Sequence, residues 1–302
     1  MTTPDEAARA GALLAPPAEL GTLSVTGSDR LTWLQGIVTC DVEGLPPGEG
    51  RWGLLLTRQG KVLADFLLMG DAGALRLGMA RAVTPRAHDY LTSFLIMEDA
   101  DLADDSASFS WVVLHGPRAP EIAATVAARH GAASSSIDVT GLGGAAIVVP
   151  RDKEKALRRD AIAEGAVAAT NEDFTRLRVE RLVPLHGIDM DEQRSPHEVS
   201  LERRTVSWSK GCYLGQEAVC MQDMRGKVKR RLAIVRFEGA VVPASGAKVL
   251  DASGSVVGET RSAAQSALLG GPAALAFLGA TSATPGTALT VDGARGEVVE
   301  PR

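Results

Sequence analysis

The chain has 302 residues, of which 45% are hydrophobic and 23% charged, a composition typical of a folded globular protein with a sizeable core. Its net charge of −5 excludes a surface built as a whole to attract nucleic acid or an anionic membrane. The apolar runs, such as 53–56 and 145–149, are far too short to span a bilayer. We therefore expect neither nucleic acid nor a membrane among its partners.

The N-terminus and the cysteines indicate the compartment. Residues 1–9 hold Asp5 and Glu6 and no basic segment, and the apolar run that follows is too short for the core of a signal peptide. The three cysteines are odd in number and widely spread, which argues for reduced thiols rather than a disulfide framework. The sequence therefore predicts a cytoplasmic location.

The first part of the chain predicts strands mixed with helices. Residues 1–20 are rich in Ala and Pro and read as a partly ordered lead-in. A short strand over 23–26 is followed by a helix that Ser28 or Asp29 can cap. Three strands over 52–57, 61–69 and 74–79 are separated by short turns, which indicates an antiparallel meander. A helix opens at Thr84-Pro85.

The middle of the chain continues this mixture and then becomes irregular. We expect strands over 110–115 and 145–149, and helices over 117–130, 152–164 and 172–182. Residues 183–210 have little periodicity and contain Pro184, Gly187 and Pro196. Long ordered loops often carry function, so this segment is a candidate site region.

From residue 229 onward the pattern is all-β. A strand over 232–237 precedes two hairpins, 249–257 around Asp251-Ala252-Ser253-Gly254 and 289–299 around Asp292-Gly293. Short strands with turns at this spacing favour a small barrel or sandwich. The fold class is therefore α+β, with a core over 1–226 and an all-β module over 227–302, and not a doubly wound parallel sheet.

The segment Lys210-Gly211-Cys212-Tyr213-Leu214-Gly215-Gln216-Glu217 is the most informative motif. With a cation two residues away and glycine before it, Cys212 is a candidate for a reactive thiolate, the nucleophilic form of cysteine. A buried structural cysteine in a Gly-rich turn is the alternative, because free cysteines are among the most buried residues. The residue types alone do not decide between a reactive thiolate and a buried structural cysteine.

Other candidate groups have two interpretations each. Asp65 interrupts an apolar strand, and it either needs partners in a buried setting or lies in water at an exposed face. The basic stretch over 225–231 is either a solvated strand edge or an attractor for an anionic ligand. Gly141-Leu142-Gly143-Gly144 lacks the spacing of a phosphate-binding loop. The histidines and cysteines have no metal-binding spacing, so we expect no resident metal.

The eight-residue motif resembles the K-G-C-[FY]-x-G-Q-E signature of the YgfZ-type folate-binding proteins, which are relatives of the aminomethyltransferase, or T-protein, of the glycine cleavage system. Further segments resemble the family along most of the chain: Leu34-Gln35-Gly36 with Thr39-Cys40-Asp41-Val42, Gly60 to Asp65, Arg178 to Asp189, Pro196-His197-Glu198, and Arg225 to Leu232.

The resemblance implies a three-lobed ring of two interleaved α+β lobes and a C-terminal β-barrel, with a strand lobe at about 51–105 inserted in the first lobe. It implies tetrahydrofolate as the cofactor and a role in assembly or repair of iron–sulfur clusters of other enzymes, with client or assembly proteins as partners. It makes Cys212, Lys210 and Asp65 the candidate catalytic residues. Candidate cofactor-binding residues are Glu198, Asp65, Tyr213, Gln216, Glu217 and Arg225.

The departures from the T-protein pattern favour the YgfZ side. T-proteins have paired aspartates where this chain has Ala64-Asp65, and their R-x-E-x-G run is here Arg178-Val179-Glu180-Arg181-Leu182, without the glycine. The segment 220–224 is atypical for the YgfZ side and alters the residues near Cys212. A folate-dependent aminomethyl or one-carbon transferase is the alternative function, and a folate-sensing scaffold without chemistry is a third.

Overall fold

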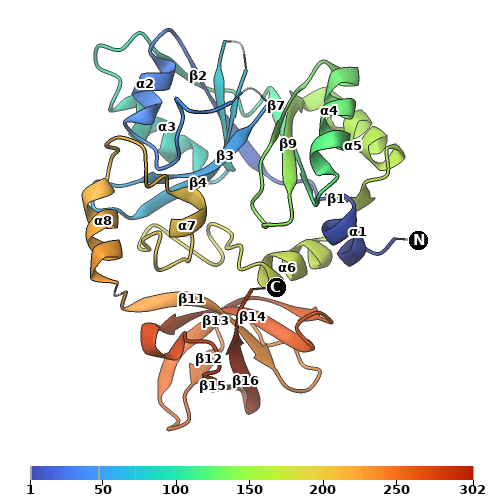
Figure 1. Cartoon of the computed structure of the whole chain (residues 1–302), viewed down its shortest axis with the longest axis vertical. Coiled ribbons are helices and arrows are strands. Elements are labelled where there is room, and N and C mark those ends of the chain that lie inside the picture. Colours follow the sequence, from blue (N-terminus) through green and yellow to red (C-terminus); the bar gives the residue numbers. More distant parts are fainter. Residues whose placement is uncertain (1, 47, 72, 227, 302) are drawn as a thin grey trace. The chain divides into compact units, whose positions relative to one another are not determined.

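The computed structural model describes residues 2–46, 48–71, 73–226 and 228–301 (Figure 1). The chain divides into two compact units that interleave in sequence. The first unit contains residues 1–170 and 204–216, and the second contains 171–203 and 217–302. Helices and sheets mix in the first unit and a closed barrel ends the chain, which confirms the predicted α+β class. The boundary at residue 226 and an inserted lobe over 51–105 stay predictions.

Among the described residues, none of the helices has the length and apolar character needed to cross a bilayer.

One sheet of the first unit contains the predicted meander. Its order is β3-β4-β5-β2-β6, with bounds β2 Leu20–Thr26, β3 Gly50–Leu56, β4 Val62–Gly70, β5 Leu75–Ala80 and β6 Asp101–Asp104. Short turns make β3, β4 and β5 antiparallel neighbours, and Leu54 lies opposite Asp65 in the register. Strand β2 joins the other side of β5, which local sequence did not predict.

Two helices cover one face of this sheet. They are α2 (Arg30–Gln35) and α3 (Thr84–Thr92). Leu34 of α2 and Leu91 of α3 are fully buried and belong to the same core cluster as Leu55, Phe66 and Leu77 of the sheet. Burying each such side chain stabilises the fold by about 1.5–3 kcal/mol relative to leaving it exposed.

The second sheet has the order β10-β1-β7-β9-β8. Its bounds are β1 Leu13–Leu14, β7 Phe109–His115, β8 Ala133–Ser136, β9 Gly144–Pro150 and β10 Val167–Ala168. Helices α4 (Ala119–His130) and α5 (Glu154–Ala163), the latter preceded by a 3₁₀ turn η1 (Arg151–Lys153), pack on it. The C-cap of α4 is Gly131, whose φ of +62° lies in the left-handed region that glycine often adopts at the end of a helix.

Gly78 and Trp111 bring the two sheets of the first unit together. A Cβ atom at Gly78 would lie 2.4 Å from the Trp111 ring, so only glycine allows this approach. The indole Nε1 of Trp111 donates to the hydroxyl of Thr22 on β2 at 3.0 Å. The hydroxyl of Thr22 thus supplies a hydrogen-bond acceptor for the buried indole of Trp111.

The N-terminal segment differs from its prediction. Residues Pro4–Ala10 form helix α1 with a complete capping box, in which Thr3 and Glu6 exchange hydrogen bonds. Ser28 and Asp29 do not cap α2 with their side chains and instead bond to Asp99. The capping box of α1 was not recognised in the sequence. The contacts with Asp99 join residues that are far apart in the chain, so local sequence could not predict them.

The second unit contains a closed barrel of order β11-β14-β13-β12-β15-β16. Its bounds are β11 Arg230–Phe237, β12 Lys248–Leu250, β13 Val256–Ser266, β14 Gly271–Gly279, β15 Ala288–Val291 and β16 Ala294–Val299, with a 3₁₀ turn η2 at Ala280–Ser282. Both predicted hairpins are confirmed. In the second, Asp292 and Gly293 both have positive φ, as a two-residue type I′ turn requires.

Helix α6 (Asn171–Glu180) packs on the barrel through a buried ion pair. Arg178 donates to Asp189 at 2.8 Å and to the hydroxyl of Ser262 on β13 at 3.0 Å. The Arg178 side chain is 4% exposed and that of Asp189 is 0% exposed. Because unpaired charges are costly in the interior, this network fixes the helix, the loop and the strand together.

Candidate functional site

The signature loop is the segment 210–217, and it carries Cys212 on the surface. Residues 211–213 are irregular, Leu214-Gly215 form a turn, and α8 (Gln216–Arg225) begins at Gln216. Cys212 is exposed while Tyr213 is buried. The alternative interpretation of Cys212 as a buried structural cysteine is therefore wrong. The side chain that is buried at this point of the loop is that of Tyr213.

Backbone contacts hold the signature loop on the first unit. The amide of Leu214 donates to the carbonyl of Gly36 at 3.2 Å, at the end of α2. Gly215 has φ +81°, and a Cβ atom there would lie 2.6 Å from the carbonyl oxygen of Thr57. The loop thus rests on two segments that the family resemblance singled out, residues 34–36 and the turn that leads into β4.

Lys210 anchors the same loop from the inside. Its Nζ donates to the carbonyl oxygens of Val38 and Cys40, both at 2.8 Å, and lies 5.5 Å from the ring of Tyr213. Burial lowers the pKa of Lys210, while the neighbouring Cys40 and Asp41 act in the opposite direction. The structure thus gives the ammonium partners other than Cys212, and activation of that thiol by Lys210 stays a prediction.

Cys40 has the opposite environment to Cys212. It is 4% exposed, and burial raises the pKa of its thiol to about 12. A thiol with this pKa is protonated and unreactive at neutral pH. Of the two cysteines in the first unit, only Cys212 is placed for chemistry with a partner molecule.

Asp65 lies half-buried on β4 and is oriented by a tryptophan. The indole Nε1 of Trp52 on β3 donates to Asp65 Oδ2 at 3.1 Å. The guanidinium of Arg204 lies over the Trp52 ring, 5.1 Å from its centroid. Trp52 and Arg204 also line a pocket of about 270 Å³ together with Arg51 and Asp138. The carboxylate is therefore held as a hydrogen-bond acceptor, and the sequence did not predict its tryptophan donor.

Gln35 gives a physical role to the Leu34-Gln35-Gly36 motif. Its Oε1 accepts from the amide of Val42 at 2.7 Å, and its Nε2 donates to Asp41 at 2.9 Å. The neighbouring Thr39 donates its hydroxyl to the carbonyl of Thr205 at 2.7 Å. The motif thus holds residues 39–42 in place, and these in turn hold the segment that leads to the signature loop.

Glu198 belongs to the second unit, in the loop between α6 and the barrel. Its Oε2 accepts from the amide of Ser195 at 2.9 Å. Its carbonyl accepts from the amide of Leu232 on β11 at 2.7 Å. The side chain is half-buried, and the loop that carries it is tied to the barrel at this point.

Polar pairs around Glu198 were missed by sequence reasoning. Asp223 of α8 accepts from Arg203 at 3.0 Å and lies 3.2 Å from His197 Nε2. Glu202 accepts from Arg231 at 2.6 Å. These contacts join residues far apart in sequence, so no local spacing could have revealed them.

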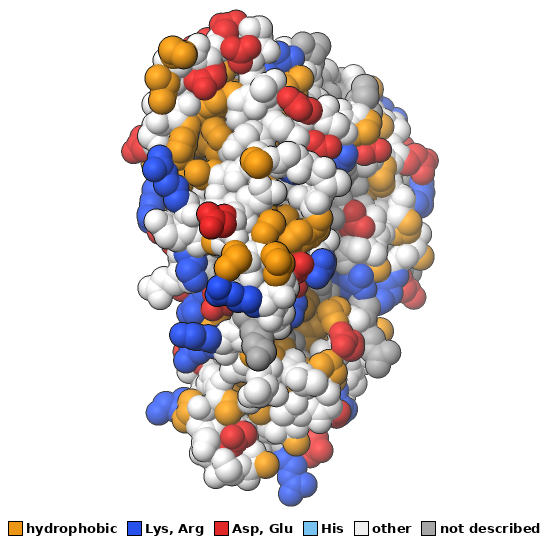
Figure 2. All heavy atoms as spheres, turned by 60° about the vertical axis from the view of Figure 1, so that its left-hand side comes forward, with side chains coloured by type: hydrophobic (Ala, Val, Ile, Leu, Met, Phe, Trp, Pro, Cys, Tyr) orange, Lys and Arg blue, Asp and Glu red, His pale blue; other side chains and the backbone are white. Residues whose placement is uncertain are grey.

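The remaining predicted residues lie on α8 and at the start of the barrel. Gln216 is half-buried, and Glu217 and Arg225 are exposed at the two ends of the helix. Lys229 and Arg230 are exposed, Arg231 is paired, and Lys227 lies outside the described residues. Figure 2 brings the α8 side forward and shows hydrophobic side chains beside Lys and Arg side chains on that surface. Met221 and Met224 are exposed on α8.

Leu182 occupies the position where the T-protein run has glycine, and it has a glycine-like backbone. Its φ is +51°, in the left-handed region. A leucine there carries strain of about 1–2 kcal/mol, while its side chain packs beside the Val179 cluster of the second unit. At this departure from the pattern, the chain places a leucine on a backbone conformation that glycine adopts without strain.

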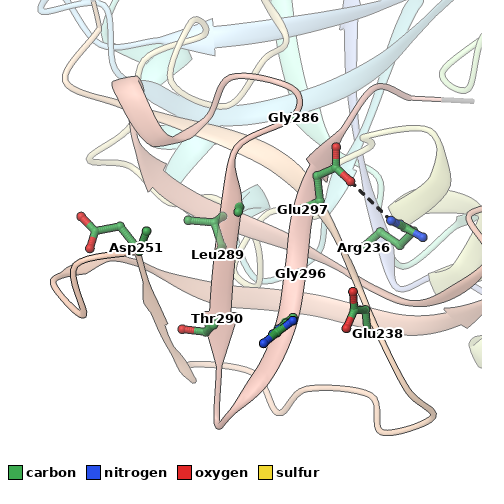
Figure 3. A pocket seen from close by; sticks show the side chains of 11 residues that line it. Arg236, Glu238, Asp251, Gly286, Leu289, Thr290, Gly296 and Glu297 are labelled. Atoms are coloured by element: carbon green, nitrogen blue, oxygen red, sulfur yellow. Dashed lines mark hydrogen bonds and ion pairs between the residues drawn. The ribbon is translucent and has the colours of Figure 1, made fainter.

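The barrel carries a separate pocket of about 580 Å³ (Figure 3). Arg236, Glu238, Arg295 and Glu297 line it, and Arg236 pairs with Glu297 at 3.4 Å. None of the residues predicted for function lines this pocket. Across the part of the chain that is described, no three His, Cys, Asp or Glu side chains are grouped to hold a metal ion.

Comparisons with known proteins agree with this architecture. Residues 5–151 match the GCVT N-terminal domain, and residues 230–301 match the glycine cleavage T-protein C-terminal barrel domain. An aminomethyltransferase from Nostoc sp. is 26% identical, over 97% of this chain and 83% of its own length. The tRNA-modifying protein YgfZ of Vibrio vulnificus is also 26% identical, over 82% of this chain and 76% of its own.

A solved structure has the same fold. The glycine cleavage system aminomethyltransferase T from Bartonella henselae superposes with a TM-score of 0.82, over 100% of this chain and 90% of that one, at 19% identity. With both T-protein domains present in the expected order, this chain belongs to the T-protein-like family.

Proposed function

We propose that this protein binds tetrahydrofolate and acts as an accessory factor for assembly or repair of iron–sulfur clusters in other enzymes, with Cys212 as the working thiol. The proposal rests on the signature Lys210–Glu217, which resembles the YgfZ type, and on the relative named YgfZ. The single observation that carries it is the exposure of Cys212 on a loop whose flanking residues are fixed.

The position of the thiol suits transfer chemistry with a macromolecular client. Lys210 and Leu214 attach the loop on both sides of Cys212, so the sulfur is held at the surface without being covered. An exposed thiol on a fixed backbone loses little conformational entropy when it meets a partner. The cluster of the client is the cargo of this reaction and is not a resident group of this chain.

The residues also suit the chemistry of a folate. A pterin ring presents N–H donors, for which a half-buried carboxylate such as Glu198 is a matching acceptor. The Glu198 carboxylate is already oriented by the amide of Ser195. When bound, tetrahydrofolate supplies nitrogens that carry one-carbon units, and the assigned role of Glu198 is to bind and orient the pterin.

Folate titration tests the first half of the proposal. Tetrahydrofolate is titrated into the wild type, Glu198→Ala and the control Glu238→Ala, whose carboxylate lines the barrel pocket. We expect binding by the wild type and the control, and binding weakened at least tenfold in Glu198→Ala. Absence of binding by the wild type would reject every folate-dependent function for this chain.

Complementation tests the thiol. Cells depleted of the protein are assayed for aconitase-type and radical cluster enzymes, and are then supplied with wild type, Cys212→Ala or the control Cys220→Ala. We expect rescue by the wild type and the control only. Full rescue by Cys212→Ala would remove the thiol from the mechanism and favour a scaffold without chemistry.

A folate-dependent aminomethyl or one-carbon transferase is the second candidate. Two observations favour it: Asp65 is held as an oriented carboxylate by Trp52, and the first matched relatives are named aminomethyltransferases. Purified protein would then turn over an aminomethyl or methyl donor with tetrahydrofolate, and Asp65→Asn would abolish turnover. Tight folate binding without turnover would leave the accessory function as the better account.

A further inference from the structure

The first unit carries a pocket of about 630 Å³ that contains none of the residues predicted for function. Its lining comes from the segment before β2, the residue after β5, the region where β7 begins and the region where α5 begins. Two arginines and two glutamates line it, Arg81 and Arg151 with Glu19 and Glu154. One cavity thus presents both positive and negative side chains to a ligand.

The two arginines converge on a single backbone oxygen. Arg81 Nη1 donates to the carbonyl oxygen of Ser106 at 2.8 Å, and Arg151 Nη2 donates to the same oxygen at 2.6 Å. Because both nitrogens bond to one atom, they lie less than about 6 Å apart. The carbonyl is neutral, so the positive charge of both guanidinium groups remains available to an anion.

The glutamates of the pocket do not neutralise these arginines. Among the described residues, neither Arg81 nor Arg151 forms an ion pair within 4.0 Å. The same holds for Glu19 and Glu154 in that part of the chain. Exposed arginines elsewhere in the unit do pair, as Arg129 does with a glutamate at 2.5 Å. All four side chains are therefore able to pair with the charges of a ligand.

A buried hydroxyl adds a polar group that lacks a partner. Ser110 lines the pocket and is 3% exposed, and its Oγ makes no hydrogen bond among the described residues. A buried hydroxyl without a partner is costly, and the great majority of such groups are paired in folded proteins. A polar atom of a ligand in the pocket would be a matching partner.

The remaining lining residues are apolar: Pro17, Ala18, Leu20 and Ala107. A volume of about 630 Å³ lies in the range of cavities that hold small organic molecules and far exceeds that of a single ion. The pocket therefore has room for an apolar group in addition to charged groups.

We propose that this pocket binds a zwitterionic α-amino acid with an apolar side chain. Its carboxylate pairs with the two guanidinium groups, whose N–H donors match the geometry of a carboxylate. Its ammonium group pairs with the carboxylates of Glu19 and Glu154, which are hydrogen-bond acceptors when ionised. The two glutamates would repel a simple anion, and the two arginines would repel a simple cation. A ligand that carries both charges therefore suits the pocket best.

Titration with L-leucine and L-phenylalanine, followed by ligand-observed NMR, tests the inference. Each amino acid is compared with the analogue that lacks its ammonium group, isocaproate or phenylpropanoate, and with the analogue that lacks its carboxylate, isoamylamine or phenylethylamine. We expect at least one of the two amino acids to bind with a Kd below about 1 mM. It should bind at least tenfold more tightly than either of its analogues, because each analogue leaves one pair of charged side chains without a partner.

Two double variants test the two ends of the ligand. Arg81→Gln/Arg151→Gln removes both charges and keeps an amide donor at each position, and we expect it to bind the amino acid at least tenfold more weakly. Glu19→Gln/Glu154→Gln should weaken binding of the amino acid several-fold without weakening binding of the analogue that has only the carboxylate. Arg159→Gln is the matched control, because Arg159 is 78% exposed on α5 and does not line the pocket.

The titration is done without folate, so its result does not depend on the proposed function. Lack of binding by both amino acids at about 10 mM would overturn the inference. Equal affinity for the carboxylate analogue would overturn it too, because the pocket would then take simple anions, and so would full affinity in the arginine variant. If circular dichroism shows that the arginine variant does not fold, Glu19→Gln decides, because Glu19 is exposed. Unchanged affinity of that variant for the amino acid would then overturn the inference.

Discussion

The indole N–H of Trp52 orients the Asp65 carboxylate. Asp65 breaks an apolar strand, and its pattern left open whether it lies in water or among partners. In the structure it is half-buried and accepts from Trp52 at 3.1 Å. A hydrogen bond to a charged group contributes about 1.5–3 kcal/mol, more than one between neutral groups. The carboxylate is thus both stabilised and fixed in direction.

Replacing Trp52 by phenylalanine keeps most of the ring and removes this donor. We expect the free energy of unfolding to fall by about 1–2 kcal/mol, because the half-buried Asp65 carboxylate loses a hydrogen-bond donor. Urea denaturation measures the loss. Trp208→Phe is the control, since Trp208 is 42% exposed and should change stability little. Equal losses in the two variants would contradict the role of the Trp52 bond.

The buried thiol of Cys40 should make the stability of the protein depend on pH. The thiol ionises near its ordinary value of 9.0 in the unfolded chain, but burial raises its pKa to about 12 in the folded protein. Between these values the unfolded state has released a proton that the folded state keeps, so stability falls as pH rises. Wild type should therefore lose stability faster than Cys40→Ala from pH 8.5 to 10.5 in urea denaturation. Parallel losses would show that Cys40 contributes nothing to this window.

At the residue scale, the sequence indicated which residues are candidates for the site but not which groups their side chains contact. The family resemblance made Cys212, Lys210, Asp65 and Glu198 candidates, and the structure gives each a defined environment. The acceptors of Lys210 are carbonyl groups about 170 residues upstream. A periodicity reading covers only neighbours in the chain, so it could not find contacts made by the fold.

At the scale of elements, the turn before α8 depends on a glycine. Gly215 has φ +81°, and a Cβ atom there would meet the Thr57 carbonyl at 2.6 Å. Both features oppose any other residue, the first by strain and the second by steric overlap. The start of α8 and the attachment of the signature loop therefore rely on the same position.

Gly215→Ala should destabilise the protein by about 1–3 kcal/mol and speed cleavage of the signature loop by proteases. Gly211→Ala is the matched control in the same loop, because no atom lies within 4 Å of its Cβ position. Thermal unfolding and limited proteolysis report the two effects. Similar behaviour of both variants would show that the loop tolerates displacement at the Thr57 turn.

Elements with local signals were predicted well. The β3-β4-β5 meander has short turns, and the β15–β16 hairpin has Asp292-Gly293. The strands β1 and β10 were missed, because each has two residues and they pair in parallel across about 150 residues of chain. Helix α8 was missed because Gln216–Arg225 shows little amphipathic pattern and only Val219 is buried in it.

At the scale of the whole molecule, each unit has its own stabilising network. In the second unit, Arg178 and Asp189 are buried together, and removing one would leave the other charge unpaired. We expect Arg178→Met to cost about 3–5 kcal/mol. The exposed pair between Arg236 and Glu297 should contribute under about 1 kcal/mol, so Arg236→Met is the control.

Hydrogen exchange can show which part of the structure loses stability in Arg178→Met. Faster exchange in Arg178→Met should be concentrated in residues 171–203 and 217–302, the segments of the second unit. Adding Asp189→Asn should restore part of the stability, because the buried carboxylate is then neutral. No recovery in the double variant would show that packing of Arg178, and not its charge, stabilises the unit.

The interleaving of the two units has a consequence for synthesis on the ribosome. Residues 204–216 complete the first unit, yet they are translated after residues 171–203 of the second. Until they emerge, Thr39 lacks the carbonyl of Thr205 and Gly36 lacks the amide of Leu214. The nascent first unit therefore remains unfinished for at least 34 residues of elongation after residue 170, and Cys212 is among the last groups added to it.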